Sequence, residues 1–223
     1  KPRQLLVSHC VCLTFKMAAD SEVIKLVVVG DAGTGKTSII KRYVNNFFSE
    51  DHKATVGVDF AVKHVNINGK DVRLQLWDIA GQERFGSSAS KVYYKEALGA
   101  LLVYDISRPQ TFDTVAKWKA EIDNMVRLPD GEGAIPVVLI GNKCDVEMGD
   151  GQVDQSHLNR FCEEHEFLSW FDTSAYSGEG IEEAIRCLVE KILSYPDVFS
   201  RKREKNAIFK PELQNGYKDT NCC

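Results

Sequence analysis

The clearest chemistry in the sequence lies in a glycine-rich segment, Gly30-Asp-Ala-Gly-Thr-Gly-Lys-Thr37, which has the spacing G-x-x-x-x-G-K-T. It follows an apolar run at 23–29, typical of a buried strand, and opens a segment predicted to be helical. In such a loop the backbone N–H groups converge on phosphate oxygens, and the helix dipole adds attraction. Lys36 would reach the outer phosphates and the Thr37 hydroxyl would ligate Mg²⁺. A chance match is disfavoured by this order of strand, loop and helix, so we predict a nucleoside triphosphate site of unspecified base.

A second polar segment, Asn142-Lys-Cys-Asp145, follows a predicted strand at 137–140. It therefore lies at the carboxyl end of a sheet strand, where α/β folds bind ligands. A carboxylate there can accept hydrogen bonds from both N1–H and the N2 amine of guanine, whereas adenine offers neither donor. Thr173-Ser-Ala175 follows the next short strand, so its backbone could meet the oxygen of the base. Alone, the first segment could be a solvated loop; beside a phosphate loop it predicts guanine.

Periodicity predicts that strands and helices alternate, which is typical of an α/β domain with a mainly parallel sheet. Asn68-Gly69 separates two alternating runs and predicts a hairpin, so one strand of the six should be antiparallel. The predicted strands are 23–29, 60–67, 72–77, 100–104, 137–140 and 167–171. About five helices are predicted to flank the sheet, at 37–45, 91–98, 111–127, 153–164 and 181–193.

Composition excludes several classes of protein. The 223 residues suit one domain with tails, and 43% apolar and 27% charged residues are ordinary for a globular chain. The formal net charge of -4 argues against a nucleic-acid partner. No apolar run reaches the roughly 18 residues that span a bilayer. The seven cysteines show no paired C-x-x-C units, so we expect reduced thiols rather than a zinc site or a disulfide framework.

We predict three regions along the chain. Residues 1–22 are interpreted as a disordered N-terminal extension, with Met17 as the expected true start. Residues 23–195 form the predicted domain. Residues 196–223 lack an apolar face and carry six basic and four acidic side chains, so we predict a flexible tail.

Together these motifs resemble the Ras superfamily, and specifically the Rab GTPases, over about residues 23–193. The resemblance implies a P-loop NTPase small G domain that cycles between GDP- and GTP-bound states, hydrolyses GTP with Mg²⁺ and regulates membrane trafficking. The segment Asp78-Ile-Ala-Gly-Gln82 resembles the second switch of the Rab subgroup associated with lysosome-related organelles.

The resemblance also implies roles for individual residues around the nucleotide. Asn142 and Asp145 would hold guanine, with the Lys143 stem along the ring and Phe48 against it. For Phe48, and more strongly for Phe47, the alternative is a loop aromatic that fills the core. The implied nucleotide contacts are Asp31, Ala32, Gly33, Thr34, Gly35, Lys36, Thr37, Ser38, Phe48, Thr55, Gly81, Asn142, Lys143, Asp145, Ser174, Ala175 and Tyr176.

Hydrolysis is assigned through the same resemblance. Thr55 in the first switch would ligate Mg²⁺ together with Thr37 and Asp78, and Gln82 would orient the attacking water beside Lys36 and Thr55. The N–H of Gly81 would meet the γ-phosphate. The sequence shows no arginine obviously placed to act in cis, so we expect slow unaided hydrolysis and an activating protein that supplies one in trans.

Surface and tail residues complete the implied switch. Phe60, Trp77 and Tyr93 match the aromatic triad that Rab proteins present to effectors, although ordinary sheet packing is the alternative, above all for Trp77. The segment between Phe85 and Tyr93 looks one residue longer than usual. The implied partners are an exchange factor, a GTPase-activating protein, a GDP-dissociation inhibitor, a prenylation escort and transferase, and trafficking effectors.

The chain ends in Cys222-Cys223, which resembles the double geranylgeranylation site of Rab proteins. Two lipids give stable membrane anchoring where one does not. The implied location is the cytosolic face of an endomembrane, such as a late endosome or lysosome-related organelle. The alternative for the pair is two exposed thiols.

Two other functions compete with this interpretation. The first is a GTP-binding adaptor with negligible turnover, disfavoured by the presence of Gln82, Thr55 and Lys36. The second is an ATP-using P-loop enzyme, disfavoured by Asn142 and Asp145.

Overall fold

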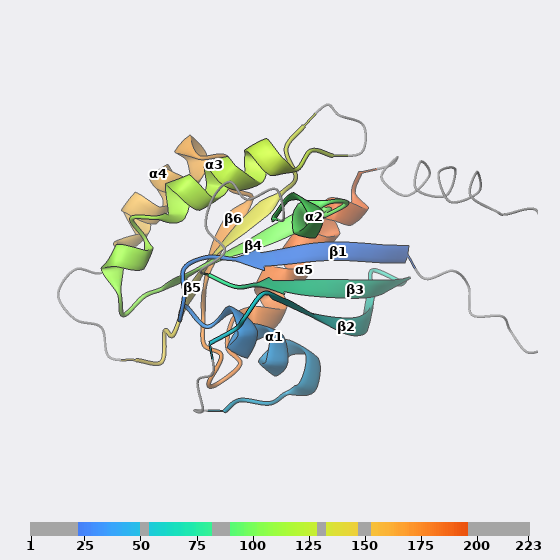
Figure 1. Cartoon of the computed structure of the whole chain (residues 1–223), viewed down its shortest axis with the longest axis horizontal. Coiled ribbons are helices and arrows are strands. Elements are labelled where there is room, and N and C mark those ends of the chain that lie inside the picture. Colours follow the sequence, from blue (N-terminus) through green and yellow to red (C-terminus); the bar gives the residue numbers. More distant parts are fainter. Residues whose placement is uncertain (1–21, 50–53, 82–89, 129–132, 147–152, 196–223) are drawn as a thin grey trace, which may run out of the picture.

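One six-stranded sheet forms the centre of the computed structural model, which describes residues 22–49, 54–81, 90–128, 133–146 and 153–195 (Figure 1). The strands lie in the order β2-β3-β1-β4-β5-β6. Their bounds are β1 Glu22–Val29, β2 Val58–Ile67, β3 Lys70–Ile79, β4 Gly99–Asp105, β5 Val137–Asn142 and β6 Ser169–Thr173. All neighbouring pairs are parallel except β2 and β3. The predicted fold class is therefore confirmed.

Helices cover both faces of the sheet (Figure 1). Their bounds are α1 Lys36–Asn45, α2 Ser90–Tyr94, α3 Val115–Met125, α4 Gln155–Glu164 and α5 Ile181–Leu193. One core cluster contains side chains of α1 and α5, and the other contains side chains of α2, α3 and α4. Strand β1 supplies both clusters, because its alternate residues Leu26 and Val27 point to opposite faces. The fold is thus three-layered, with β1 buried on both sides.

The strand order reverses beside β1, which lies between β3 and β4 although it precedes both in sequence. Loops that leave the carboxyl ends of neighbouring strands diverge at such a point and open a crevice. The phosphate-loop segment leaves β1, and the Asn142 segment leaves β5. The topology therefore brings the two predicted binding segments to the same edge of the sheet.

The predicted hairpin is present and longer than the sequence pattern indicated. Val65 pairs with Val72 and Ile67 with Lys70 across the turn. Asn68 and Gly69 both have positive φ, at 52° and 79°, as a two-residue turn that matches the twist of the strands requires. Backbone pairing runs from Val58 with Ile79 to Ile67 with Lys70, so both strands are longer than the runs in which apolar and polar residues alternate.

The predicted helix at 111–127 is wrong at its start. A 3₁₀ turn at Pro109–Thr111 comes first, and α3 begins at Val115. The Thr111 hydroxyl accepts from the Asp105 N–H at 2.9 Å and donates to the Arg108 carbonyl at 2.7 Å. These side-chain hydrogen bonds satisfy backbone groups locally and compete with regular helix. The predicted strand at 167–171 likewise begins two residues late, at Ser169.

We predict that Leu188→Ala in α5 lowers the free energy of unfolding by about 2–5 kcal/mol. Leu188 is fully buried, and its Cδ1 lies 3.0 Å from where a Cβ on Gly99 of β4 would stand, so its loss leaves a cavity that the sheet cannot fill. Urea unfolding of both variants and the unmodified chain measures the effect. The neighbouring partly exposed Cys187→Ala is the control, and equal losses in both variants would contradict the packing described.

Candidate nucleotide-binding site

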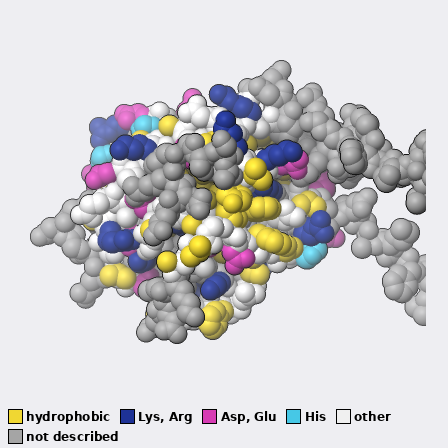
Figure 2. All heavy atoms as spheres, in the orientation of Figure 1, with side chains coloured by type: hydrophobic (Ala, Val, Ile, Leu, Met, Phe, Trp, Pro, Cys, Tyr) yellow, Lys and Arg dark blue, Asp and Glu magenta, His cyan; other side chains and the backbone are white. Residues whose placement is uncertain are grey.

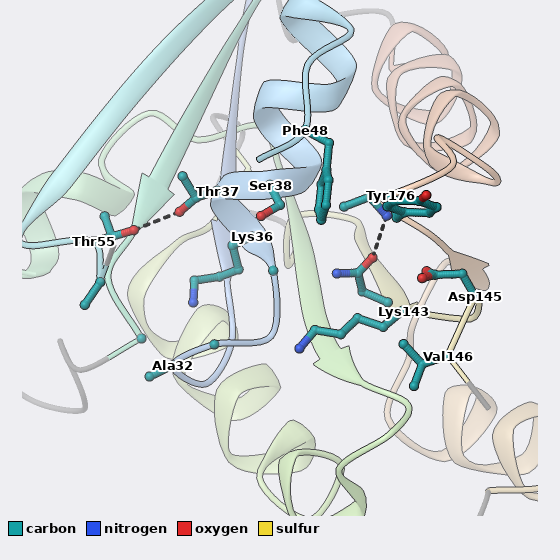
Figure 3. Close-up of a pocket in the computed structure, with 16 residues that line it drawn as sticks. Ala32, Lys36, Thr37, Ser38, Phe48, Thr55, Lys143, Asp145, Val146 and Tyr176 are labelled. Atoms are coloured by element: carbon teal, nitrogen blue, oxygen red, sulfur yellow. Dashed lines mark hydrogen bonds between the residues drawn. The ribbon is translucent and has the colours of Figure 1, made fainter. Parts of the chain in front are cut away.

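A cavity of about 650 Å³ opens at the carboxyl edge of the sheet, within the size range of sites that hold a small ligand (Figure 3). Every implied nucleotide contact lines it except Asp31, Thr34 and Ser174. Sequence reasoning missed two lining residues, Ala54 and Val146. The complete lining is Ala32, Gly33, Gly35, Lys36, Thr37, Ser38, Phe48, Ala54, Thr55, Gly81, Asn142, Lys143, Asp145, Val146, Ala175 and Tyr176.

Lys36 occupies the centre of the phosphate loop. Its Nζ donates to the carbonyls of Gly30 at 2.9 Å and Asp31 at 3.0 Å, and the residue is only 5% exposed. Burial lowers the pKa of Lys36 to about 8, although the negative charges of Asp78 and Asp31 partly oppose that shift. The nearby carboxylates do not fully balance the positive charge of this buried ammonium. It should therefore attract phosphate oxygens strongly.

Asp31 and Thr34 support the loop from behind the cavity. The Thr34 hydroxyl donates to the Asp31 carbonyl at 3.0 Å, which closes a turn within the loop. The Asp31 carboxylate accepts from the indole N–H of Trp118 at 2.9 Å. Because Trp118 belongs to α3, this bond fixes the loop to the opposite helix layer from α1. These residues thus position the loop, and neither side chain forms the cavity wall.

Three oxygen-bearing side chains meet at one end of the cavity, where Mg²⁺ was predicted. The hydroxyls of Thr37 and Thr55 are 2.8 Å apart (Figure 3). The Thr37 hydroxyl also donates to Asp78 Oδ2. Asp78 Oδ1 is buried without a hydrogen-bond partner. Burial raises the pKa of Asp78, against the hydrogen bond from Thr37 and the charge of Lys36. One carboxylate with hydroxyl oxygens fits Mg²⁺, which keeps few protein ligands and shares phosphates.

The amide of Asn142 joins the loops at the base end of the cavity. Its Nδ2 donates to the Thr34 carbonyl at 2.8 Å, and its Oδ1 accepts from the Ala175 N–H and the Thr173 hydroxyl, both at 3.2 Å. A Cβ on Gly35 would lie 2.2 Å from that Nδ2, so the approach requires glycine. Asn142 therefore holds three segments together as well as lining the cavity.

Asp145 reaches the cavity wall with an oriented carboxylate. The Ser174 hydroxyl donates to Asp145 Oδ1 and accepts from the Ser177 N–H at 3.0 Å. Ser174 itself is buried and does not line the cavity. It was predicted as a nucleotide contact, but its position is one of support for Asp145.

Two aromatic rings and an arginine border the base end. Phe48 and Tyr176 meet edge to face with centroids 5.5 Å apart. Arg42 of α1 donates from Nε to the Ala175 carbonyl at 2.8 Å, and its guanidinium lies 6.0 Å from the Phe48 ring. The core-filling alternative is wrong for Phe47, which is 54% exposed. Phe48 and Tyr176 both line the cavity.

A buried carboxylate that the sequence analysis missed lies beneath this site. Asp105 ends β4, and its Oδ2 accepts from Lys143 Nζ at 2.7 Å and Arg108 Nε at 2.8 Å. Burial alone would raise the pKa of Asp105, but the hydrogen bonds from Lys143, Ser107 and Arg108 outweigh it and hold that pKa below its ordinary value. The sequence feature that could have predicted Asp105 is its position as an acidic residue at the carboxyl end of a buried strand.

Some predicted functional residues cannot be placed. Gln82, Cys222 and Cys223 lie outside the described residues, as does most of the segment predicted to carry an extra residue. Their roles stay predictions.

We predict that the ligand-free, metal-free protein gains stability as pH rises from about 8 toward 10.5 through Lys36. The folded chain releases this proton near pH 8 and the unfolded chain keeps it to about 10.5, so the unfolded state binds more protons in that window. The gain is at most about 3 kcal/mol. Melting temperatures of the unmodified chain and of Lys36→Met are measured from about pH 7.5 to 9.5. The difference between the two at each pH reports Lys36, because the other titrating groups are the same in both proteins. A difference that does not change with pH would contradict the buried-ammonium description.

Comparison with known proteins agrees with this geometry. Residues 25–194 match the model of the Ras family. Ras-related protein Rab-32 from Homo sapiens is 53% identical over 190 residues, which cover 85% of this chain and 82% of that protein. Rab-32A from Dictyostelium discoideum is 54% identical over 170 residues, covering 76% and 77%. Rab-7L1 from Homo sapiens is 39% identical over 210 residues, covering 93% of this chain and all of the relative.

These matches give no support to an adaptor without turnover or to an ATP-using enzyme. The family match spans all six strands except the first three residues of β1. The chain belongs to the Ras family, and within it to the Rab small GTPases, which bind guanine nucleotides, hydrolyse GTP and act in membrane trafficking.

Proposed function

We propose that the cavity holds GDP or GTP with Mg²⁺ in one orientation, with the phosphates on the loop at Gly30–Thr37 and the base beside Asp145. One observation carries this proposal: the phosphate loop and the base-reading segments, more than 100 residues apart in sequence, line the same cavity. No single motif would require that arrangement. The shared cavity supports a guanine nucleotide as the ligand, because a ligand recognised by its phosphates alone would not need the base-reading segments.

Each end of the cavity contributes a different part of recognition. Lys36 and the loop N–H groups bind the outer phosphates, and Asp145 accepts from the guanine edge. Lys143, Phe48 and Tyr176 contact the faces and edges of the base. Thr37, Thr55 and Asp78 would hold Mg²⁺, which would neutralise phosphate charge when bound.

For hydrolysis we propose that Gln82 orients the attacking water while Gly81 and Thr55 sense the γ-phosphate. Gly81 and Thr55 both line the cavity, on the side of Lys36. The reaction needs positioning and charge stabilisation rather than covalent chemistry by the protein. Arg108 donates to the Ala32 carbonyl of the phosphate loop but does not line the cavity. We therefore propose that an activating protein would supply the missing cation in trans.

An exposed aromatic surface supports the proposed binding of effectors. Phe60 is 61% exposed and stacks on Trp77 with centroids 5.8 Å apart, and Lys25 Nζ lies 3.8 Å from the centre of the Trp77 ring. Tyr93 of α2 is half-buried and packs against the same core cluster as Trp77. Figure 2 shows hydrophobic side chains gathered over the β1, β3 and β2 region. Since β2 and β3 lead from and into the switches, occupancy of the cavity would alter this surface.

We further propose that Cys222 and Cys223 carry geranylgeranyl groups that attach the protein to the cytosolic face of an endosomal or lysosome-related membrane. The described residues contain no helix long and apolar enough to cross a bilayer. An escort with a prenyl transferase would add the lipids, a GDP-dissociation inhibitor would cover them, and an exchange factor would reload the switch. The domain limits of 23–195 and the tail at 196–223 belong to the same proposal.

We predict that Asp145→Asn lowers GDP affinity about 100-fold, because asparagine lacks the charge and directs an NH₂ donor, in place of one acceptor oxygen, at a guanine donor. Competition titration of GDP against ADP should show that the preference for guanine falls by the same factor. Asp154→Asn is the matched control, since Asp154 caps α4 through its bond to the His157 N–H at 2.8 Å and asparagine caps equally well. Unchanged GDP affinity in Asp145→Asn would refute the base assignment.

We predict that a double Ser substitution at Cys222 and Cys223 abolishes incorporation of a labelled geranylgeranyl donor by a prenylation extract. Serine cannot form the thioether, and the protein should then remain in the supernatant when membranes are pelleted. Cys187→Ser, in the partly exposed position on α5, is the control and should be labelled normally. Labelling of the double variant at the normal level would exclude the anchor.

A further inference from the structure

Three charged side chains, Lys143, Asp105 and Arg108, connect the two ends of the cavity. Asp105 Oδ2 is shared between Lys143 Nζ, at 2.7 Å, and Arg108 Nε, at 2.8 Å. Arg108 then donates from Nη2 to the Ala32 carbonyl in the phosphate loop at 3.2 Å. Lys143 and Ala32 both line the cavity, whereas Arg108 and Asp105 do not. One carboxylate thus joins the guanine-reading loop to the phosphate loop.

The Arg108 guanidinium lies against the phosphate loop, although its side chain is 44% exposed. A Cβ on Gly33 would stand 3.2 Å from Nη2, so the planar group lies directly against the outer surface of the loop. The Asp105 carboxylate that holds it has no solvent exposure and also accepts from the Ser107 N–H at 3.0 Å and hydroxyl at 2.6 Å. Arginine suits this role because its fork presents several donors in fixed directions, which a lysine ammonium does not.

The bond to Ala32 acts on a peptide unit that faces the ligand. The Ala32 carbonyl and the Gly33 N–H belong to the same peptide, and the two groups of a trans peptide point in opposite directions. Since the carbonyl accepts from Arg108, the N–H is directed away from Arg108, as a phosphate-binding N–H in such a loop would be. A cation on that carbonyl polarises the peptide and strengthens its N–H as a donor. Arg108, Lys143 and Asp105 together carry one net positive charge.

We propose that Arg108 is a positioning residue that strengthens phosphate binding through the Ala32–Gly33 peptide and, through Asp105, couples it to Lys143 at the base. It slows release of nucleotides that reach the loop with a β-phosphate. Arg108 does not touch the nucleotide. The inference rests on guanine-nucleotide binding in this cavity.

The test measures release of a fluorescent GDP analogue from the full chain with Mg²⁺. Arg108→Ala should release it roughly 10- to 100-fold faster, the range expected for one hydrogen bond to a charged group. Arg108→Lys should restore part of the effect, since it keeps the charge but cannot bridge Asp105 and Ala32 together. Arg160→Ala, at an exposed position on α4, is the control and should match the unmodified chain.

A second readout separates positioning from general loosening of the site. Competition titration should show a loss of GDP affinity in Arg108→Ala and a much smaller loss of GMP affinity, because GMP lacks the β-phosphate that the loop cradles. Release within twofold of the unmodified rate, or equal losses for GDP and GMP, would overturn the proposal. Failure of the unmodified chain to bind GDP would instead refute the proposed function.

Discussion

The buried amide of Asn142 is the interaction on which the shape of the site depends. It bonds to the loop after β1 through Thr34 and to the segment at the end of β6 through Thr173 and Ala175, so one side chain of β5 joins two other segments. Sheet pairing already joins Asn142 to Thr173, but the phosphate loop lies beyond the end of β1 and is joined to them by this side chain. The amide supplies both a donor and acceptor lone pairs from one rigid plane, which a carboxylate or an ammonium could not do. Position 35 requires glycine for the same reason, because a Cβ there would lie 2.2 Å from the amide nitrogen.

Around this amide the cavity is organised by charges that the fold does not fully compensate. Lys36 is buried with carbonyl partners, and Asp78 keeps one buried oxygen unpaired. Burying such groups costs free energy unless something of opposite charge arrives. The proposed anionic nucleotide and divalent cation would compensate both, and a ligand that binds only the folded state stabilises it more as its affinity rises. The same residues that make the empty site costly therefore make the filled site stable.

The sequence predicted much of this because the decisive patterns are local. The order of strand, glycine loop and helix identified Lys36 and Thr37, and the strand ends identified Asn142 and Asp145. The Asn68-Gly69 turn predicted the hairpin and hence the one antiparallel pair. Contacts that depend on distant packing were not predictable. The contacts of Asp105 and Arg108 depend on the position of β4 between β1 and β5, which the sequence does not show. Ser174 was predicted to contact the nucleotide, but its hydroxyl donates to Asp145 instead. The start of α3 was missed because Thr111 closes a turn through its side chain rather than through helical bonds.

The bond between Asp31 and Trp118 has a consequence for how tightly a ligand can be held. It fixes the phosphate loop to α3, while the loop continues directly into α1 on the other face of the sheet. The loop is thus tethered to both helical layers before any ligand arrives. Its N–H groups have little conformational freedom left to lose, and in a preorganised site less of the contact energy is spent on ordering. Attachment of the loop to both helical layers therefore lowers the entropic cost of binding phosphates.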